Sequence, residues 1–123
     1  MATVLIIEDE APLLILAESV LQNAGYMTLT AGSLEEAQAL IRSDDQKIDL
    51  VFTDIILSDH REGGLQIGQV VRQTAPETPV LYTTAAQVTD GMKALFVWPY
   101  RFLPKPYTDH QLIEAVAELL RKA

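Results

Sequence analysis

The chain has 123 residues, a hydrophobic fraction of 49% and a formal net charge of −8. Its length suits one domain, residues 1–123, and no apolar run is long enough to span a bilayer, so we expect no membrane contact. The acidic balance disfavours direct nucleic-acid binding, which depends on a basic patch, and the absence of cysteine excludes disulfides and is typical of a cytoplasmic protein.

Short apolar runs alternate with amphipathic stretches in five rounds, the pattern of a parallel sheet wrapped by helices. The first apolar run covers residues 3–7 and precedes a helical pattern over 12–24, which stops before Gly25. The second run covers 27–31 and leads to a helix that Ser33 caps, with an acid three residues on as in a capping box.

The remaining rounds repeat this alternation. Further strands are predicted at residues 50–53, 80–84 and 101–103, and further helices at about 65–73 and 89–97. A final helix begins after a cap at Thr108 or Asp109. The sequence therefore predicts an α/β fold, a five-stranded parallel sheet with helices on both faces.

Polar side chains stand where the predicted strands end, the edge at which open α/β sheets bind ligands. They are Glu8 and Asp9 after the first strand, Asp54 after the third, Thr83 and Thr84 closing the fourth, and Lys105 after the fifth. Close carboxylates repel one another, so the cluster requires a cation or raised pKa values. Mg²⁺ prefers such oxygen ligands, whereas the lack of cysteine and of a nearby histidine argues against Zn²⁺.

Four segments at these strand ends, VLIIEDE, LVFTDI, PVLYTTA and FLPKPY, occur in the order of the signature blocks of a known family. They resemble the response-regulator receiver domain of two-component signalling, and the similarity covers essentially the whole chain. The resemblance implies the (βα)5 flavodoxin-like receiver fold, as a stand-alone domain without an output domain.

The resemblance also implies roles for the acidic residues. Asp54 matches the phosphoacceptor, and Glu8 and Asp9 match the acidic pair of the family. Asp9 would bind Mg²⁺ directly and Glu8 mostly through water. The backbone carbonyl of Ile56 would be a further ligand.

Three more positions follow from the same comparison. Lys105 matches the family lysine, and Pro106 after it implies a cis peptide. Counting along PVLYTTA places Thr84, rather than Thr83, at the switch hydroxyl. Phe102 falls on the aromatic switch position, although an ordinary core role for it is equally open.

Two segments depart from the family pattern. DIILSDHREGGL, which follows the phosphoacceptor strand, is longer than usual and lacks the common Met-Pro pair. Trp98, Pro99 and Tyr100 stand where many receivers have small residues, so we expect a changed output surface.

The implied function is that of a switch which catalyses only its own phosphorylation and dephosphorylation. Asp54 would take a phosphoryl group from a sensor histidine kinase or a histidine phosphotransferase, in a reaction that needs Mg²⁺. A homodimer through the fourth helix, fifth strand and fifth helix is a possible result.

Other functions remain open on the sequence alone. The chain could be a constitutive docking module or a phosphate sink. An aspartyl-phosphate phosphohydrolase is disfavoured, because Ile56 stands where a second acid is expected. Glu10 is interpreted as an acid at the start of a helix, where the helix dipole favours negative charge. His60 and His110 are interpreted as surface residues rather than as metal ligands or phosphate carriers.

Overall fold

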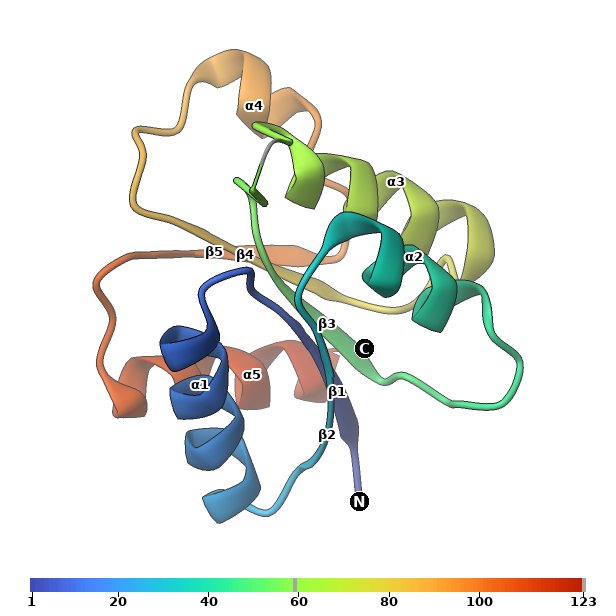
Figure 1. Cartoon of the computed structure of the whole chain (residues 1–123), viewed down its shortest axis with the longest axis vertical. Helices are drawn as coiled ribbons and strands as arrows, with labels where there is room; N and C mark the ends of the chain where they lie inside the picture. Colours follow the sequence, from blue (N-terminus) through green and yellow to red (C-terminus); the bar gives the residue numbers. More distant parts are fainter. Residues whose placement is uncertain (59, 123) are drawn as a thin grey trace.

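A computed structural model describes residues 1–58 and 60–122. Strands and helices alternate along these residues (Figure 1): β1 (Thr3–Ile7), α1 (Ala11–Asn23), β2 (Met27–Ala31), α2 (Leu34–Arg42), β3 (Leu50–Asp54), α3 (Gly63–Thr74), β4 (Val80–Thr84), α4 (Asp90–Ala94), β5 (Tyr100–Pro104) and α5 (Asp109–Lys122).

The strands form one parallel sheet in the order β2-β1-β3-β4-β5. Helices α1 and α5 cover one face, and α2 and α3 cover the other (Figure 1). This confirms the predicted fold class. Side chains of β1 alternate between the two layers: Val4 and Ile6 pack towards α1 and α5, whereas Leu5 and Ile7 pack towards α2 and α3. Burial on both faces explains the continuous apolar runs.

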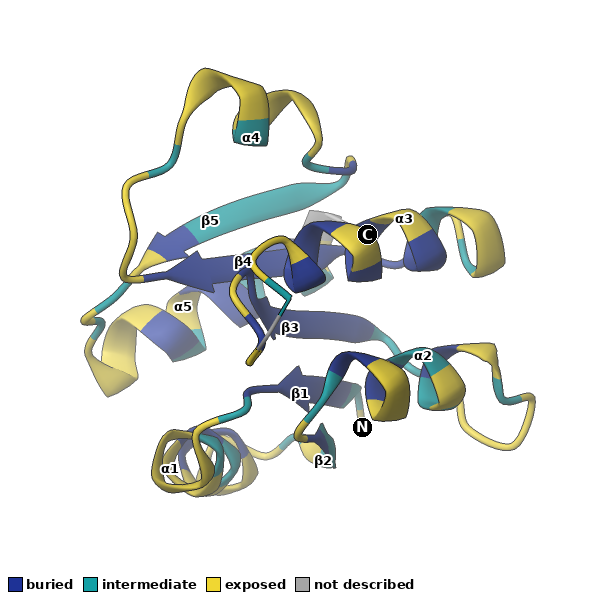
Figure 2. Cartoon of the chain, turned by 45° about the horizontal axis from the view of Figure 1, so that its top comes forward, coloured by how far each residue is buried: buried dark blue, intermediate teal, exposed yellow. Residues whose placement is uncertain are grey.

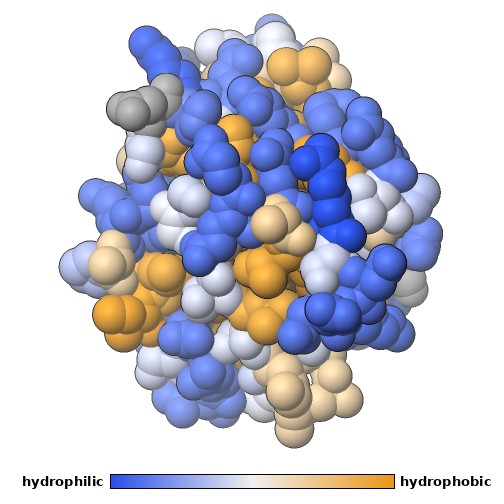
Figure 3. Space-filling model, turned by 45° about the vertical axis from the view of Figure 1, so that its right-hand side comes forward, coloured by the Kyte–Doolittle hydropathy of each residue, from blue (hydrophilic) through white to orange (hydrophobic). Residues whose placement is uncertain are grey.

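The central strands are more buried than the edges of the sheet (Figure 2). Residues of β3 and β4 are buried throughout, whereas β5 at one edge is mostly half-buried and α4 beside it is largely exposed. The outer surface is mainly hydrophilic on the face that Figure 3 shows, with hydrophobic side chains in separate patches.

The helix caps agree with the sequence pattern. The Ser33 hydroxyl accepts a hydrogen bond from the Glu36 amide at 3.1 Å, and the Glu36 carboxylate accepts one from the Gly32 amide at 2.6 Å. Of the two candidate caps of α5, Thr108 has the capping role, because its hydroxyl accepts a hydrogen bond from the Gln111 amide at 3.1 Å.

The boundaries of α3 and α4 differ most from the prediction. Helix α3 begins at Gly63, two residues before the predicted start, because Gly64 packs against the end of β3 and Gly63 packs against Leu57. Helix α4 is shorter than predicted, and Thr89 caps it through a hydrogen bond from the Met92 amide at 3.1 Å. It ends early because the Val97 amide donates to the Tyr82 hydroxyl at 3.1 Å instead of continuing the helix.

Tyr82 lies in the middle of β4 and is fully buried. Its ring stacks on Phe96 with centroids 4.4 Å apart. Burial raises the pKa of the Tyr82 hydroxyl to about 12. That hydroxyl lies against Gly68 of α3, where an added Cβ would come within 2.2 Å of the oxygen. The tyrosine therefore requires a residue without a side chain on the facing helix.

Gly68→Ala is expected to lower the free energy of unfolding by about 1–3 kcal/mol, because the new methyl group would overlap the Tyr82 hydroxyl. Tyr82→Phe removes this oxygen but leaves the buried Val97 amide without its partner. In Gly68→Ala/Tyr82→Phe the overlap with the hydroxyl oxygen is gone, so the double variant should lose less than the two single losses combined. Urea denaturation of the four proteins measures this coupling, and strictly additive losses would contradict the packing argument.

Candidate functional site

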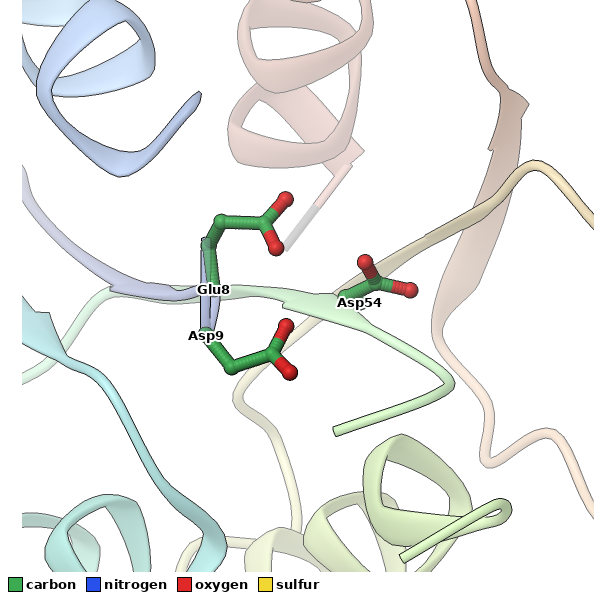
Figure 4. Close-up of side chains that lie close together, drawn as sticks. All are labelled: Glu8, Asp9 and Asp54. Carbon is green, nitrogen blue, oxygen red and sulfur yellow. The ribbon is translucent and has the colours of Figure 1, made fainter. Parts of the chain in front are cut away.

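Three carboxylates meet at one edge of the sheet (Figure 4). Glu8 and Asp9 directly follow β1, and Asp54 is the last residue of β3, so the parallel arrangement places them at neighbouring strand ends. One carboxylate oxygen from each lies within 4.8 Å of the others. Glu8 and Asp54 are buried and Asp9 is half-buried. The group can offer a divalent cation several oxygen ligands.

Lys105 reaches this group from the end of β5. Its amide donates to the Thr84 carbonyl at 3.1 Å, and the Lys105–Pro106 peptide is cis, as expected. The Lys105 ammonium lies 2.7 Å from Asp54 Oδ2 and 2.8 Å from Glu8 Oε1. Only 15% of the Lys105 side chain is exposed, so water screens these ion pairs less than it would on the surface.

The local environment shifts the pKa values of the charged groups in different directions. Burial raises the pKa of Glu8, although the Lys105 ammonium opposes this effect. Burial by itself would lower the pKa of Lys105, but its hydrogen bonds to Asp54 and Glu8 outweigh that effect and raise it above the usual range. Lys105 is therefore charged at neutral pH. Burial is the main cause of the raised Glu8 pKa, and the nearby Asp54 charge adds to it.

The loop after β3 supplies hydrogen bonds to two of the carboxylates. The Ile56 amide donates to Asp54 Oδ1 at 3.2 Å. The Ser58 amide and hydroxyl donate to Asp9 Oδ2 at 2.6 and 3.1 Å. Burial would raise the pKa of Asp9, but the Ser58 hydrogen bonds outweigh burial and hold it below its usual value.

The two adjacent threonines of β4 point to opposite faces of the sheet. Thr84 lines an open hollow of about 270 Å³ together with Asp9, Asp54 and Lys105. Its hydroxyl accepts a hydrogen bond from the Ala86 amide at 3.2 Å. The Thr83 hydroxyl is buried and makes no hydrogen bond within residues 1–58 and 60–122. The structure thus brings Thr84 to the carboxylates.

Phe102 is half-buried in β5 and packs on the edge of the core. Its ring is stacked against Phe96 with centroids 6.1 Å apart. A second hollow, of about 500 Å³, is lined by both Thr84 and Phe102. Trp98 is 73% exposed, and its peptide bond to Pro99 is cis, which the sequence analysis did not anticipate.

Ser58 is the contributor to this site that sequence reasoning missed. It lies in a polar loop, where serine is common in turns, and nothing in the local pattern links it to Asp9, 49 residues earlier in the chain. By contrast, all the carboxylates and the lysine named from the strand ends lie in one cluster.

Comparison with known proteins places these features in a family. The response regulator receiver domain matches residues 4–117. The chain belongs to this family. The receiver domain is 29% identical, over its whole length, to the transcriptional regulatory protein CpxR of Klebsiella pneumoniae, of which it spans 51%. It is 35% identical to the response regulator protein PilR of Pseudomonas aeruginosa, over 95% of the chain and 26% of that protein.

Solved structures have the same fold. A response regulator receiver protein from Sinorhizobium medicae has a TM-score of 0.87 and 32% identity, over 98% of this chain and 94% of that one. A CheY-like receiver domain from Methanospirillum hungatei also has a TM-score of 0.87, at 21% identity, over 99% of this chain and 95% of that one. The chain spans about half of the first curated relative named above and about a quarter of the second.

The described part of the receiver domain, residues 1–58 and 60–122, includes no helix with the length and hydrophobicity needed to cross a bilayer. Its acidic cluster of Glu8, Asp9 and Asp54 could hold a metal ion.

Proposed function

We propose that this receiver domain accepts a phosphoryl group on Asp54 and thereby changes its contacts with other proteins. The donor would be a phosphohistidine of a sensor histidine kinase or of a histidine phosphotransferase in the cytoplasm. One observation carries the proposal: the Asp54 carboxylate lines an open hollow, 2.7 Å from the Lys105 ammonium and next to Glu8 and Asp9. Membership of the receiver family supports it.

Asp54 would act as the nucleophile. One of its carboxylate oxygens forms a bond to phosphorus while the P–N bond of the phosphohistidine breaks, and the leaving imidazole takes up a proton. Phosphoryl transfer depends mainly on positioning and on charge stabilisation. The Lys105 ammonium supplies positive charge beside Asp54, and the Thr84 hydroxyl can donate a hydrogen bond to a phosphoryl oxygen. Such a site modifies only its own aspartate.

The donor set suits Mg²⁺. Three carboxylates face one ammonium, and this excess of negative charge favours a divalent cation. Glu8, Asp9, Asp54 and the Ile56 carbonyl would hold it. When bound, Mg²⁺ would offset the charge that builds up between the carboxylates and an incoming phosphoryl group.

The structural consequence would begin at Thr84. Drawing its hydroxyl towards the new phosphoryl oxygens would empty space beside the 500 Å³ hollow that Phe102 also lines, so the ring could turn inward. The surface formed by α4, β5 and α5 would change with it. Binding of a partner, or of a second copy through this surface, would then depend on phosphorylation.

Incubation with acetyl phosphate and Mg²⁺ should add one phosphoryl group to the intact mass of the wild type and none to Asp54→Asn. Beryllofluoride with Mg²⁺ should change the Trp98 fluorescence of the wild type but not that of Asp54→Asn. Asp45→Asn, which alters an exposed loop carboxylate, is the matched control and should behave as the wild type. A folded wild type that responds to neither reagent would overturn the proposal and favour a constitutive docking module.

A further inference from the structure

We infer that Ser58 is a positioning residue that holds the Asp9 carboxylate in the orientation required to bind a divalent cation. The inference rests on the proposed function, because it concerns the cation of that site. It depends on the contacts of one loop residue with one carboxylate.

Ser58 makes two hydrogen bonds to the same oxygen of Asp9. The amide donates at 2.6 Å and the hydroxyl donates at 3.1 Å, both to Oδ2. Hydrogen bonds to an ionised carboxylate are stronger than those between neutral groups. Two donors that converge on one oxygen also restrict rotation of the carboxylate about its bond to Cβ.

The backbone holds Ser58 in place for this contact. Its φ of +50° lies in the left-handed region, which residues with a side chain rarely adopt. Leu57 and His60 are joined by two hydrogen bonds. The Leu57 amide donates to the His60 carbonyl at 3.0 Å, and the His60 amide donates to the Leu57 carbonyl at 2.7 Å. Leu57 is fully buried in the core. The turn is therefore anchored, and the Ser58 donors have a defined direction.

Asp9 needs such a constraint more than its neighbours do. Glu8 and Asp54 are buried and paired with Lys105, whereas Asp9 is only half-buried. Without Ser58, the Asp9 carboxylate could turn towards water. Carboxylates that bind metal ions are commonly held by hydrogen bonds from residues that do not touch the metal, and loss of such a partner weakens metal binding.

Ser58→Ala and Ser58→Gly test the inference through Mg²⁺ binding alone, measured by titration calorimetry without a phosphoryl donor. Both remove the hydroxyl and keep the amide. Each should weaken Mg²⁺ binding about five- to tenfold. This is near the low end of the losses seen when a hydrogen-bond partner of a metal ligand is removed, because the Ser58 amide still donates and Ser58 is exposed. Ser19→Ala, on the exposed side of α1, should bind Mg²⁺ as the wild type does.

The two variants separate positioning from backbone strain. Glycine accepts a positive φ without strain, whereas alanine does not. If both variants lose Mg²⁺ affinity, the cause is therefore the missing hydroxyl. Thermal unfolding in EDTA should show that both variants are folded. Wild-type affinity in both variants, or a loss in Ser58→Ala alone, would overturn the inference and leave the proposed function intact. Absence of Mg²⁺ binding by the wild type would overturn both.

Discussion

Lys105→Met is expected to lower the free energy of unfolding by about 3–5 kcal/mol at neutral pH in the absence of divalent cations. The ammonium lies within 2.8 Å of both Glu8 and Asp54, and these two carboxylate side chains are less than 10% exposed. Methionine has a similar volume, so the loss should come from carboxylates left without a counter-charge rather than from a cavity. Urea denaturation in EDTA measures the difference.

The pH and cation dependence of this variant should identify the cause. The folded-state pKa of Lys105 is raised above its ordinary value of 10.5, so its stabilisation is fully present below pH 10.5 and is lost as the pH rises beyond that value. Lys105→Met should not show this loss of stability at alkaline pH. Mg²⁺ should stabilise the variant more than the wild type, because no ammonium competes with it for the carboxylates.

Lys47→Met is the matched control for Lys105→Met. The Lys47 side chain is 89% exposed and lies 3.8 Å from Asp49, so its ion pair is screened by water and its loss should change stability little. Equal stability of the two variants would contradict the view that Lys105 neutralises a buried acidic cluster.

Gly64→Ala should lower the free energy of unfolding by about 3 kcal/mol or more. A Cβ at this position would lie 2.3 Å from the Asp54 carbonyl oxygen and 2.6 Å from the Ile55 Cα. These are backbone atoms, so no change of rotamer can relieve the overlap, and the cost should reach or exceed the upper part of the range for overpacking. The backbone at the end of β3 would have to move to relieve the overlap. This movement would displace Asp54, so phosphorylation by acetyl phosphate should also fall.

Gly91→Ala is the control for this substitution. Gly91 also lies in a helix, but its added Cβ would meet only the Thr89 hydroxyl, at 3.8 Å. Alanine there should be neutral or slightly stabilising, because it has the higher helix propensity. Guanidinium denaturation compares both variants with the wild type. A Gly64→Ala protein as stable as Gly91→Ala would show that α3 can move away from β3 at little cost.

The fold class and much of the candidate site could be predicted from the sequence. Apolar runs of strand length that alternate with amphipathic stretches leave few arrangements other than a parallel sheet between two helix layers. In such a sheet all strands end at the same edge, so Asp9, Asp54 and Lys105 could be placed together without knowledge of any contact. Local signals also sufficed for the cap at Ser33.

Close packing between distant segments could not be predicted in this way. Gly63 and Gly64 favour a loop by propensity, yet they begin α3, because Gly64 packs against the backbone at the end of β3 and Gly63 against the Leu57 side chain. Helix α4 ends before its sequence pattern does, because the Val97 amide donates a hydrogen bond to the Tyr82 hydroxyl. In both cases a tertiary contact outweighs a local preference of about 1 kcal/mol or less per residue.

By itself, therefore, the sequence determined the order of the elements, the layers they form and the edge at which the charged residues gather, because hydrophobic periodicity and strand direction depend on local residue types. Only the tertiary structure decided how those charges are paired and held. The ion pairs of Lys105 with Glu8 and Asp54, and the two hydrogen bonds from Ser58 to Asp9, join residues 49 to 97 positions apart. Such contacts depend on exact loop geometry and burial, which no local pattern of residues specifies.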